Sequence, residues 1–384
     1  MRVWLATDHY LPQRNGHAVA VAWWARALAE RGVDVTVIAD AWAGAEGQRQ
    51  VWRHRHYREE RLSVLPFFPP GHPLAGLLPS GRRVAGLAGA PPDVLHLHGY
   101  GPSCAQAAAA LPGVGRVISV HALPEGSGAS SWGPVQSVMR RRLARIVGAC
   151  DVVVAPSEAA ATRVREVAGC DDVRVIPTGV DEAFVAAARG GDGPPDPTRP
   201  RVLYVGRLRR EKGFGLVTAL AERHPEASWL AIGEGSAATE GVTTLGHRPL
   251  RDVALEVRDA DVLLAPAVIE TQGLAAHEAI VVGTPVAAPR GSAQAGIVVD
   301  GVNGALYDPS DLDDAWRAVV RAAGVSRDGV LATSADWRPD RLVETMLAVY
   351  GEATSARVDL RPGRATVSER GSRERPPGLT RPRP

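Results

Sequence analysis

The sequence predicts an α/β protein of two doubly wound domains, each with a parallel sheet covered by helices on both faces. Three observations support this class. The chain of 384 residues is longer than one hydrophobic core usually organises. Short apolar runs alternate with helical patterns along most of it, as in successive βαβ units. The alternation stops once, in an Ala/Gly/Pro/Asp-rich stretch over 186–201, and then restarts.

The first half opens with one βαβ unit. An apolar run over 2–6 is followed by a turn-rich segment, a helical pattern over 18–31 and a strand over 33–39. Further strands are expected over 94–98, 116–120, 152–155 and 173–176, with a basic amphipathic helix over 135–147.

The second half repeats this order. Its strands are expected over 202–205, 228–232, 261–265 and 285–288, with a helix over 312–323. The chain therefore divides into a first domain over 1–186, a linker over 187–200 and a second domain over 201–335. Ligands of doubly wound sheets bind at the carboxyl ends of the strands, so two such domains predict a central cleft as the binding site.

Composition and charge indicate an ordinary globular protein and exclude disordered, fibrous and membrane-spanning classes. Apolar residues make up 45% and charged residues 22%, as in globular proteins. No apolar run reaches the roughly 18 residues of a spanning helix, and no secretory leader is recognised, so a cytoplasmic location is expected. Cys104, Cys150 and Cys170 are far apart and predict core thiols, not a disulfide framework or a zinc site.

The net charge of +2 is uneven along the chain. Residues 355–384 hold eight arginines against three acidic residues, which leaves −3 for the rest. We therefore expect no nucleic-acid partner, because the body of the protein is not basic. The Arg/Pro-rich tail over 355–384 is expected to be disordered, since it has almost no large apolar residues.

The strongest motif is a pair of glutamates, Glu270 and Glu278, with Gly273 between them. Gly273 allows a tight turn into a helix whose free backbone amides can meet an anion. Glu278 then lies about a turn and a half into this helix, where a carboxylate can accept hydrogen bonds from ribose hydroxyls. Isolated glutamates are usually solvated, but the surrounding apolar and glycine pattern favours a site.

A second motif is the basic loop from Arg207 to Lys212, which follows a predicted strand and precedes Gly213. Two cations fixed beside a diphosphate stabilise the negative charge that grows on it as a bond to it breaks. Arg207 offers a planar fork for phosphate oxygens and Lys212 a point charge. We favour these two over Arg209 and Arg210.

Candidate residues in the first half lie at or beside predicted strand ends. Gly16 follows Asn15 in the first turn, where a backbone without a side chain can approach a ligand. His121 follows a strand whose carboxyl end lines the predicted cleft. The alternation of His96 and His98 is taken to put them on opposite faces of their strand, so that at most one points to the site and a metal pair is not expected.

Together these segments resemble the E-x7-E signature and the G-R-x4-K-G loop of retaining family 4 glycosyltransferases of the GT-B fold. The Asn15-Gly16 turn, His121 and the segment over 93–99 match further family segments, and the resemblance covers about 1–354. It implies GT-B architecture, with two Rossmann-like doubly wound domains facing a central cleft. It also implies a C-terminal helix, over 336–354, that crosses back to the first domain.

The resemblance implies a nucleoside diphosphate sugar as donor, with no metal and no other cofactor. The diphosphate would lie between Gly16 and the Arg207/Lys212 pair, and the ribose on Glu278. The transferred sugar would meet Glu270, His121 and the backbone amides of Gln272, Gly273 and Leu274. The resemblance implies that the catalytic residues are His121, Glu270, Arg207 and Lys212.

Some positions depart from the family pattern. Gln272 stands where relatives often carry an aromatic residue, Thr178 replaces an asparagine, and the loop over 290–296 lacks a glutamate common in the family. These changes cluster near the sugar pocket more than at the phosphates. The donor class is therefore better defined than the sugar or the base.

Two motifs suggest other chemistry. The glycines of Gly233-Glu-Gly235 fit a dinucleotide fingerprint, with Asp252 about twenty residues on, but no helical pattern follows them. Asp259 and Asp261 imitate a D-x-D metal motif, yet Asp261 opens an apolar strand. We interpret both as structural.

The acceptor stays open. Residues 41–90 include a basic portion over 49–61 and an apolar loop over 65–70 which, with the basic helix carrying Arg140–Arg142, fit contact with an anionic membrane at its inner face and a lipid-linked acceptor. They equally fit a wall around a small metabolite or glycan. A GT-B sugar-nucleotide epimerase and a non-catalytic nucleotide-sugar binding protein are the alternative functions.

Overall fold

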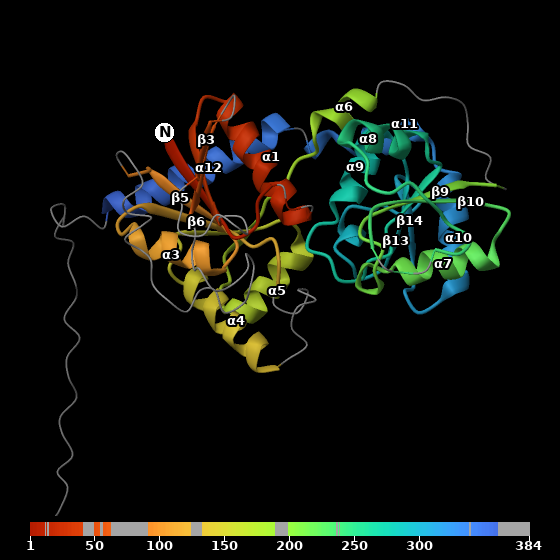
Figure 1. Ribbon diagram of the computed structural model, residues 1–384, viewed down its shortest axis with the longest axis horizontal. Helices are drawn as coiled ribbons and strands as arrows, with labels where there is room; N and C mark the ends of the chain where they lie inside the picture. Colours follow the sequence, from red (N-terminus) through yellow and green to blue (C-terminus); the bar gives the residue numbers. More distant parts are fainter. Residues whose placement is uncertain are drawn as a thin grey trace, which may run out of the picture.

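The protein forms two lobes, each built around its own sheet (Figure 1). The computed structural model describes residues 1–40 except 12 and 14, 50–53, 57–62, 91–123, 133–188, and 199–359 except 236, 238 and 338. Most of 41–90, considered above for acceptor choice, lies outside these residues.

The first lobe contains an eight-stranded sheet in the order β3-β4-β2-β1-β5-β6-β7-β8. Neighbouring strands are parallel except for β3 and β4, which pair antiparallel at one edge. The strands are β1 (Arg2–Thr7), β2 (Asp34–Asp40), β3 (Gln50–Arg53), β4 (Arg58–Leu62), β5 (Val94–His98), β6 (Gly115–Ser119), β7 (Val152–Ala155) and β8 (Val173–Val175). The helices are α1 (Gly16–Glu30), α3 (Pro102–Ala110), α4 (Gly133–Val147) and α5 (Glu158–Ala168).

The second lobe contains a six-stranded, wholly parallel sheet in the order β11-β10-β9-β12-β13-β14. Its strands are β9 (Arg201–Val205), β10 (Ser228–Ile232), β11 (Thr243–Thr244), β12 (Val262–Leu264), β13 (Val286–Pro289) and β14 (Gly304–Tyr307). The remaining helices are α6 (Glu182–Ala187), α7 (Phe214–Arg223), α8 (Leu250–Asp259), α9 (Leu274–Val282), α10 (Leu312–Ala323), α11 (Arg327–Ala332) and α12 (Pro339–Asp359). Short 3-10 turns are η1 (Arg210–Lys212), η2 (Gln294–Gly296) and η3 (Ala335–Trp337).

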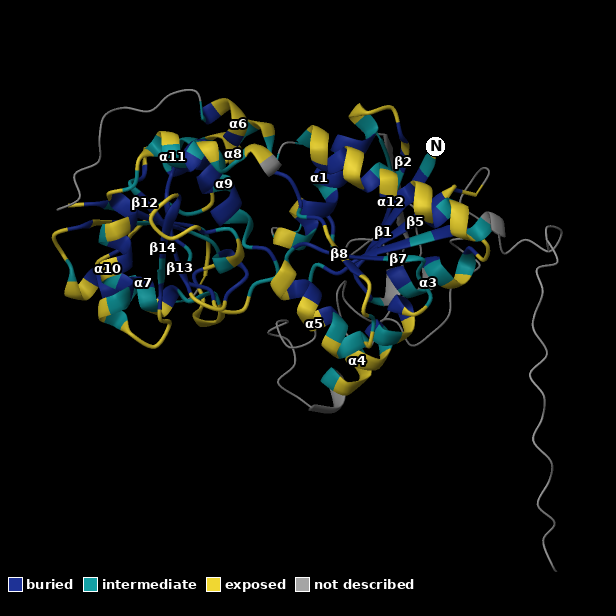
Figure 2. Cartoon of the chain, turned by 180° about the vertical axis from the view of Figure 1, so that it is seen from behind, coloured by how far each residue is buried: buried dark blue, intermediate teal, exposed yellow. Residues whose placement is uncertain are grey.

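The predicted fold class is confirmed: both lobes have parallel sheets covered by helices. Every residue of the central strands β5 and β13 is buried, as expected where helices cover both faces of a sheet. Figure 2 shows the same pattern, with buried residues on the strands and exposed ones on the outer sides of the helices. The carboxyl ends of the parallel strands in each lobe share one edge.

Two helices show where the chain passes from one lobe to the other. Phe184 of α6 is buried in the second lobe's core with Val257 and Ile280, although α6 lies inside the range 1–186 predicted for the first domain. Helix α12 follows the second lobe in the sequence but packs on the first lobe, because its Met346 and Tyr350 are buried in the core of the first lobe. The chain thus crosses between the lobes before α6 and again before α12.

Helix α12 continues past its predicted end. Residues 355–359, assigned from the sequence to a disordered tail, are helical. Arg357 Nε lies 3.1 Å from the Asp151 carboxylate, and Arg174 pairs with Glu352, so the last turns of α12 are anchored to the first lobe. The sequence pattern misses these turns because contacts with distant residues stabilise them. Residues 360–384 lie outside the described part.

Helix α4 is amphipathic, as predicted. Arg140 and Arg141 are exposed on one side, and Leu143 is fully buried on the other. In the described part of the chain, no helix combines the length and hydrophobicity that crossing a membrane requires.

Candidate functional site

Two loops of the second lobe bring Lys212 and Glu270 together. The loop after β9 ends in η1 and Gly213, and the loop after β12 carries Glu270. Gly213 has φ +74°, and a Cβ there would lie 2.7 Å from the carbonyl oxygen of Pro266, so only glycine lets the loops pack this closely. The result is an ion pair of 2.5 Å between Lys212 Nζ and Glu270 Oε1, with each side chain about one quarter exposed.

Arg207 leaves the same strand and is half exposed. Among the described residues, its guanidinium has only a long contact, 3.8 Å, with Glu211. Its backbone is fixed instead, because the Tyr204 hydroxyl donates a hydrogen bond of 2.7 Å to the Arg207 carbonyl. Burial raises the pKa of Tyr204, which keeps this hydroxyl protonated. The loop is therefore held in place while the guanidinium stays available for phosphate oxygens.

Gly273 begins helix α9 in the left-handed region, at φ +77°. A Cβ there would lie 2.6 Å from Gln294 Cγ, so this turn depends on glycine. In the structure as described, no side chain caps the start of α9. The first amides of the helix, near Gln272 and Leu274, are thus placed to meet an anionic ligand, as the sequence suggests.

Glu278, on the second turn of α9, is a partly buried carboxyl group. Among the described residues it has neither a hydrogen bond nor an ion pair. Burial, together with the nearby negative charge of Asp181, raises the pKa of Glu278 to about 7. A partly buried carboxyl without a protein partner is typical of a group kept for a ligand.

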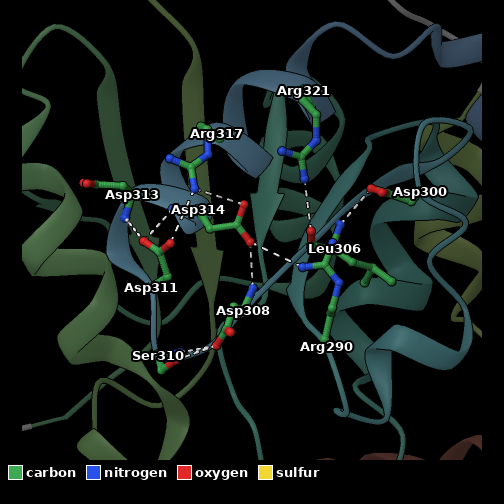
Figure 3. A network of polar contacts seen from close by, with 10 residues as sticks. All are labelled: Arg290, Asp300, Leu306, Asp308, Ser310, Asp311, Asp313, Asp314, Arg317 and Arg321. Atoms are coloured by element: carbon green, nitrogen blue, oxygen red, sulfur yellow. Dashed lines mark hydrogen bonds and ion pairs between the residues drawn. The ribbon is translucent and has the colours of Figure 1, made fainter.

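The charges around α10 show the contrasting case, in which carboxylates are paired within the protein (Figure 3). Asp314 accepts hydrogen bonds from the Asp308 amide at 2.8 Å and from Arg290 at 3.3 Å, and Arg317 contacts its other oxygen. The Asp308 amide and the arginines lower the pKa of Asp314. Arg290, which opens the loop over 290–296, is therefore engaged by Asp314.

In the first lobe, His121 follows β6 and its Nε2 lies 2.9 Å from Nδ1 of His98, the last residue of β5. The prediction that His96 and His98 point to opposite faces is wrong, because residues two apart on a strand share a face. Their ring centroids are 4.1 Å apart. His96 is buried in a structural network, with Nε2 2.8 Å from the Ser119 hydroxyl and Nδ1 2.7 Å from the Tyr350 hydroxyl.

Two further histidines, missed from the sequence, complete this cluster. His17, in the first turn of α1, has its ring centroid 5.1 Å from that of His121 and 5.2 Å from that of His9. Burial lowers the pKa of His17, and lowers that of His121 to about 4. The rings of His17 and His121 are therefore neutral at physiological pH. The histidines of this cluster share one feature of position: they lie at or after the ends of β1, β5 and β6, which all end at this edge of the sheet.

Hydrogen bonds join the two lobes beside the cluster. Thr271, next to Glu270, donates from Oγ1 to the His121 carbonyl at 2.7 Å. The Ser157 hydroxyl, which also caps α5, donates to the Thr271 carbonyl at 2.6 Å. The loop that carries Glu270 is thus attached directly to the residue predicted to meet the transferred sugar.

Two more predicted residues meet between the lobes. A Cβ on Gly16 would lie 3.6 Å from Leu274 Cδ1, an ordinary contact distance, so α1 and α9 begin close to one another. The side chain of Gln272 is 5% exposed and hydrogen-bonds the amide and carbonyl of Thr178, at 3.1 and 2.8 Å. Only the backbone of Gln272 therefore remains for the donor, and the contact explains the residue at 272 but not the one at 178, whose backbone alone takes part.

The glycines of the apparent dinucleotide fingerprint serve packing. A Cβ on Gly233 would lie 1.9 Å from the Gly206 carbonyl oxygen, and one on Gly235 would lie 2.2 Å from that of Leu208. The next helix in the described chain is α8, well beyond these glycines. They let the β10 loop pack beside the Arg207 loop.

The D-x-D segment is also structural. Asp261 accepts a hydrogen bond of 2.7 Å from the Arg201 amide, and Asp259 pairs with Arg258. Across the described ranges, no group of three His, Cys, Asp or Glu side chains is arranged to hold a metal ion.

Two doubly wound lobes that meet at the carboxyl ends of their strands define the GT-B class of fold. Solved structures agree. The chain superposes on a sucrose-phosphate synthase from Thermosynechococcus elongatus with a TM-score of 0.72 at 19% identity, over 92% of this chain and 99% of that one. It superposes on Anabaena HepE, solved in complex with UDP-glucose, with a TM-score of 0.69 at 17% identity, over 91% and 99%.

Family models then give the particular family. Residues 14–184 match Glycosyltransferase Family 4, and residues 199–324 match Glycosyl transferases group 1. Together these matches span most of both lobes, and the chain belongs to the family 4 glycosyltransferases of GT-B fold.

Curated relatives include D-inositol 3-phosphate glycosyltransferases. The one from Xylanimonas cellulosilytica is 31% identical over 56% of this chain and 60% of its own length. The one from Nocardiopsis dassonvillei is 29% identical over 69% and 71%. The chain thus spans about three-fifths of the length of the first of these relatives.

Proposed function

We propose that this protein transfers a glycosyl group from a nucleoside diphosphate sugar to a hydroxyl of an acceptor, with retention of anomeric configuration and without a metal ion. One observation carries the proposal. Glu270, which is ion-paired with Lys212, lies in the loop that leads into α9, the helix that carries Glu278, and this loop is hydrogen-bonded to His121 of the other lobe. Cations for a diphosphate and polar groups for a sugar thus come together where the lobes meet.

The second lobe would bind the donor. The diphosphate would contact Lys212, Arg207 and the amides at the start of α9, all of which favour negative charge. The Glu278 carboxyl would accept hydrogen bonds from the ribose hydroxyls. When Lys212 turns to the diphosphate, Glu270 loses its ion-pair partner and can bind hydroxyls of the transferred sugar.

Transfer breaks the bond between the anomeric carbon and the diphosphate oxygen, whose electron pair stays on the phosphate. The charge that develops there lies beside Lys212 and Arg207, so these cations stabilise the transition state more than the bound donor. The acceptor oxygen forms its bond on the same face, and the leaving phosphate takes the acceptor's proton. Glu270 need not become a covalent nucleophile.

The relatives suggest which substrates to try first. Curated relatives bear the name D-inositol 3-phosphate glycosyltransferase, so this polyol phosphate is the first acceptor to test. UDP-glucose is the first donor, since Anabaena HepE was solved with it. A lipid-linked acceptor predicts sedimentation with anionic liposomes that salt reverses, whereas a small acceptor predicts none.

The test is thermal unfolding of the full chain with UDP-, GDP-, ADP- and TDP-glucose, in the presence of EDTA. We expect one nucleotide family to raise the unfolding temperature, and the shift to disappear in Arg207→Ala and Glu278→Ala but persist in Arg209→Ala. No shift with any of these sugars, or a shift that EDTA abolishes, contradicts the proposal. Product analysis separates the alternatives: an epimerase changes the donor sugar without an acceptor, and a binding protein leaves the donor intact.

A further inference from the structure

The histidine cluster contains a hydrogen-bond arrangement that determines where two of its rings carry their protons. His98 contacts both neighbours. Its carbonyl oxygen lies 2.8 Å from His17 Nε2, and its ring Nδ1 lies 2.9 Å from His121 Nε2. His98 itself is fully buried, and its Nε2 has no hydrogen-bond partner.

The contact with His17 allows only one assignment of donor and acceptor. A carbonyl oxygen only accepts, so His17 must donate from Nε2–H. In the neutral ring, Nδ1 then holds a lone pair. No described residue hydrogen-bonds this Nδ1, and His17 as a residue is only partly buried, so the lone pair is left to accept a hydrogen bond from a ligand.

The contact between His98 and His121 allows two assignments of donor and acceptor, which differ in whether His98 Nε2 carries a proton. If His121 donates, the proton of His98 sits on Nε2 and becomes a buried N–H without an acceptor. If His98 donates from Nδ1, its Nε2 holds only a lone pair. Buried N–H groups without a partner are rarer than unpaired acceptors, so the second arrangement is favoured. His121 then accepts at Nε2 and carries its own proton on Nδ1.

We propose that His98 is a positioning residue that fixes both neighbouring tautomers, so that His121 donates from Nδ1 to one hydroxyl group of the substrate while His17 accepts from another. The two ring centroids are 5.1 Å apart, close enough for both rings to contact one sugar or polyol. The hydroxylated ligand follows from the proposed function, whereas the tautomers do not depend on it. His17 thereby becomes a substrate-binding residue, and the group that the two histidines recognise is a polyhydroxylated ring, through its hydroxyls.

The tautomers are measured on the full chain, without substrate, by long-range proton–nitrogen NMR of histidines labelled with nitrogen-15 at about pH 7.5. We expect His121 to show protonated Nδ1 and His17 to show protonated Nε2. His98→Phe, which removes the donor, should shift His121 towards protonated Nε2, and His98→Asn, whose amide can replace Nδ1–H, should restore the original pattern. His224→Asn, in the other lobe, is the matched control and should change neither signal. Protonated Nε2 on His121 in the unaltered protein, or no response to His98→Phe in a variant that still unfolds cooperatively, contradicts the proposal.

Activity gives an independent readout for the two cluster residues. Once a donor and an acceptor are known, His17→Ala and His98→Phe should each lower kcat/KM about tenfold to a hundredfold, as expected for one lost hydrogen bond in a buried site, and His98→Asn should recover most of it. Correct tautomers in a protein without transferase activity would overturn the proposed function alone. Normal activity with unchanged tautomers in His98→Phe would overturn the role of His98 alone.

Discussion

The two sides of the site differ in how they provide polarity. The second lobe presents charge: Arg207 and the Lys212–Glu270 pair, with Glu278 on α9. The first lobe presents neutral imidazoles, since burial lowers the pKa values of His17 and His121. Charge is therefore concentrated where a leaving diphosphate would gain charge, and neutral hydrogen-bonding groups lie where sugar hydroxyls would bind.

Loss of the Lys212 charge should have the largest effect. Lys212→Ala should lower kcat by a factor of about 100 to 1,000, the usual cost of removing one group that stabilises transition-state charge. Steady-state kinetics with saturating donor measures this. Arg210→Ala, an exposed cation two residues away, is the matched control and should stay within about twofold of the unaltered protein. An equal loss in both variants would show that general positive potential, and not the placed ammonium, is what matters.

Glu278→Gln should weaken donor binding and stabilise the free protein. We expect the donor Kd to rise about tenfold, because a charged acceptor for ribose hydroxyls becomes neutral. The raised pKa, about 7, means that ionising Glu278 costs folding free energy as pH rises from about 4.5 to 7. The variant should thus gain about 1–3 kcal/mol in unfolding free energy at pH 8, with the gain vanishing near pH 4. Urea titrations at both pH values measure this, and an unstabilised variant at pH 8 would mean that Glu278 is well solvated.

Thr271→Val tests the connection between the charged and the neutral side. Losing the hydrogen bond to the His121 carbonyl should lower kcat about threefold to tenfold and leave the donor Kd unchanged, because the donor contacts themselves remain. Thr345→Val, on the exposed side of α12, is the control and should have no effect. An unchanged kcat in Thr271→Val would indicate that the lobes separate at this contact during turnover.

Salt should have the smallest effect, and it should act on one side only. Raising NaCl from about 0.05 to 0.5 M should increase the donor KM a few fold through screening, and change the KM of an uncharged acceptor by less than about twofold. Initial-rate measurements with each substrate varied in turn decide this. An acceptor KM that rises as steeply as the donor KM would indicate charge on the histidine side and contradict the division into a charged and a neutral side.

Local patterns predict most of the fold. The strands over 94–98, 152–155 and 228–232 fall where runs rich in apolar residues place them, because strands covered on both faces are predominantly apolar. Local patterns predict less well which lobe a helix packs against. Phe184 enters the second lobe's core, and Arg357 extends α12 by pairing with Asp151, through contacts between residues far apart in the chain.

The same contrast holds for the site. Its charged side could be predicted because Arg207 and Lys212 lie in one short loop, and Glu270 and Glu278 flank one glycine. The neutral side is assembled from residues after β1, β5 and β6, so His17 is not recognisable as a site residue before the sheet order is known. The error at His96 and His98 came from applying the strand period wrongly, since a period of two keeps them on one face.

The most direct test of a donor site on the second lobe uses Lys212, the chain's single lysine. The protein would be treated with an amine-selective acetylating reagent, with and without the nucleotide sugar that raises its unfolding temperature, and acetylation at Lys212 followed by mass spectrometry, with the N-terminal amine as the internal reference. A donor site on the second lobe predicts that the nucleotide sugar slows acetylation of Lys212 at least several fold and leaves the N-terminal amine unaffected. Stabilisation by a nucleotide sugar with no change in the acetylation rate of Lys212 would contradict it.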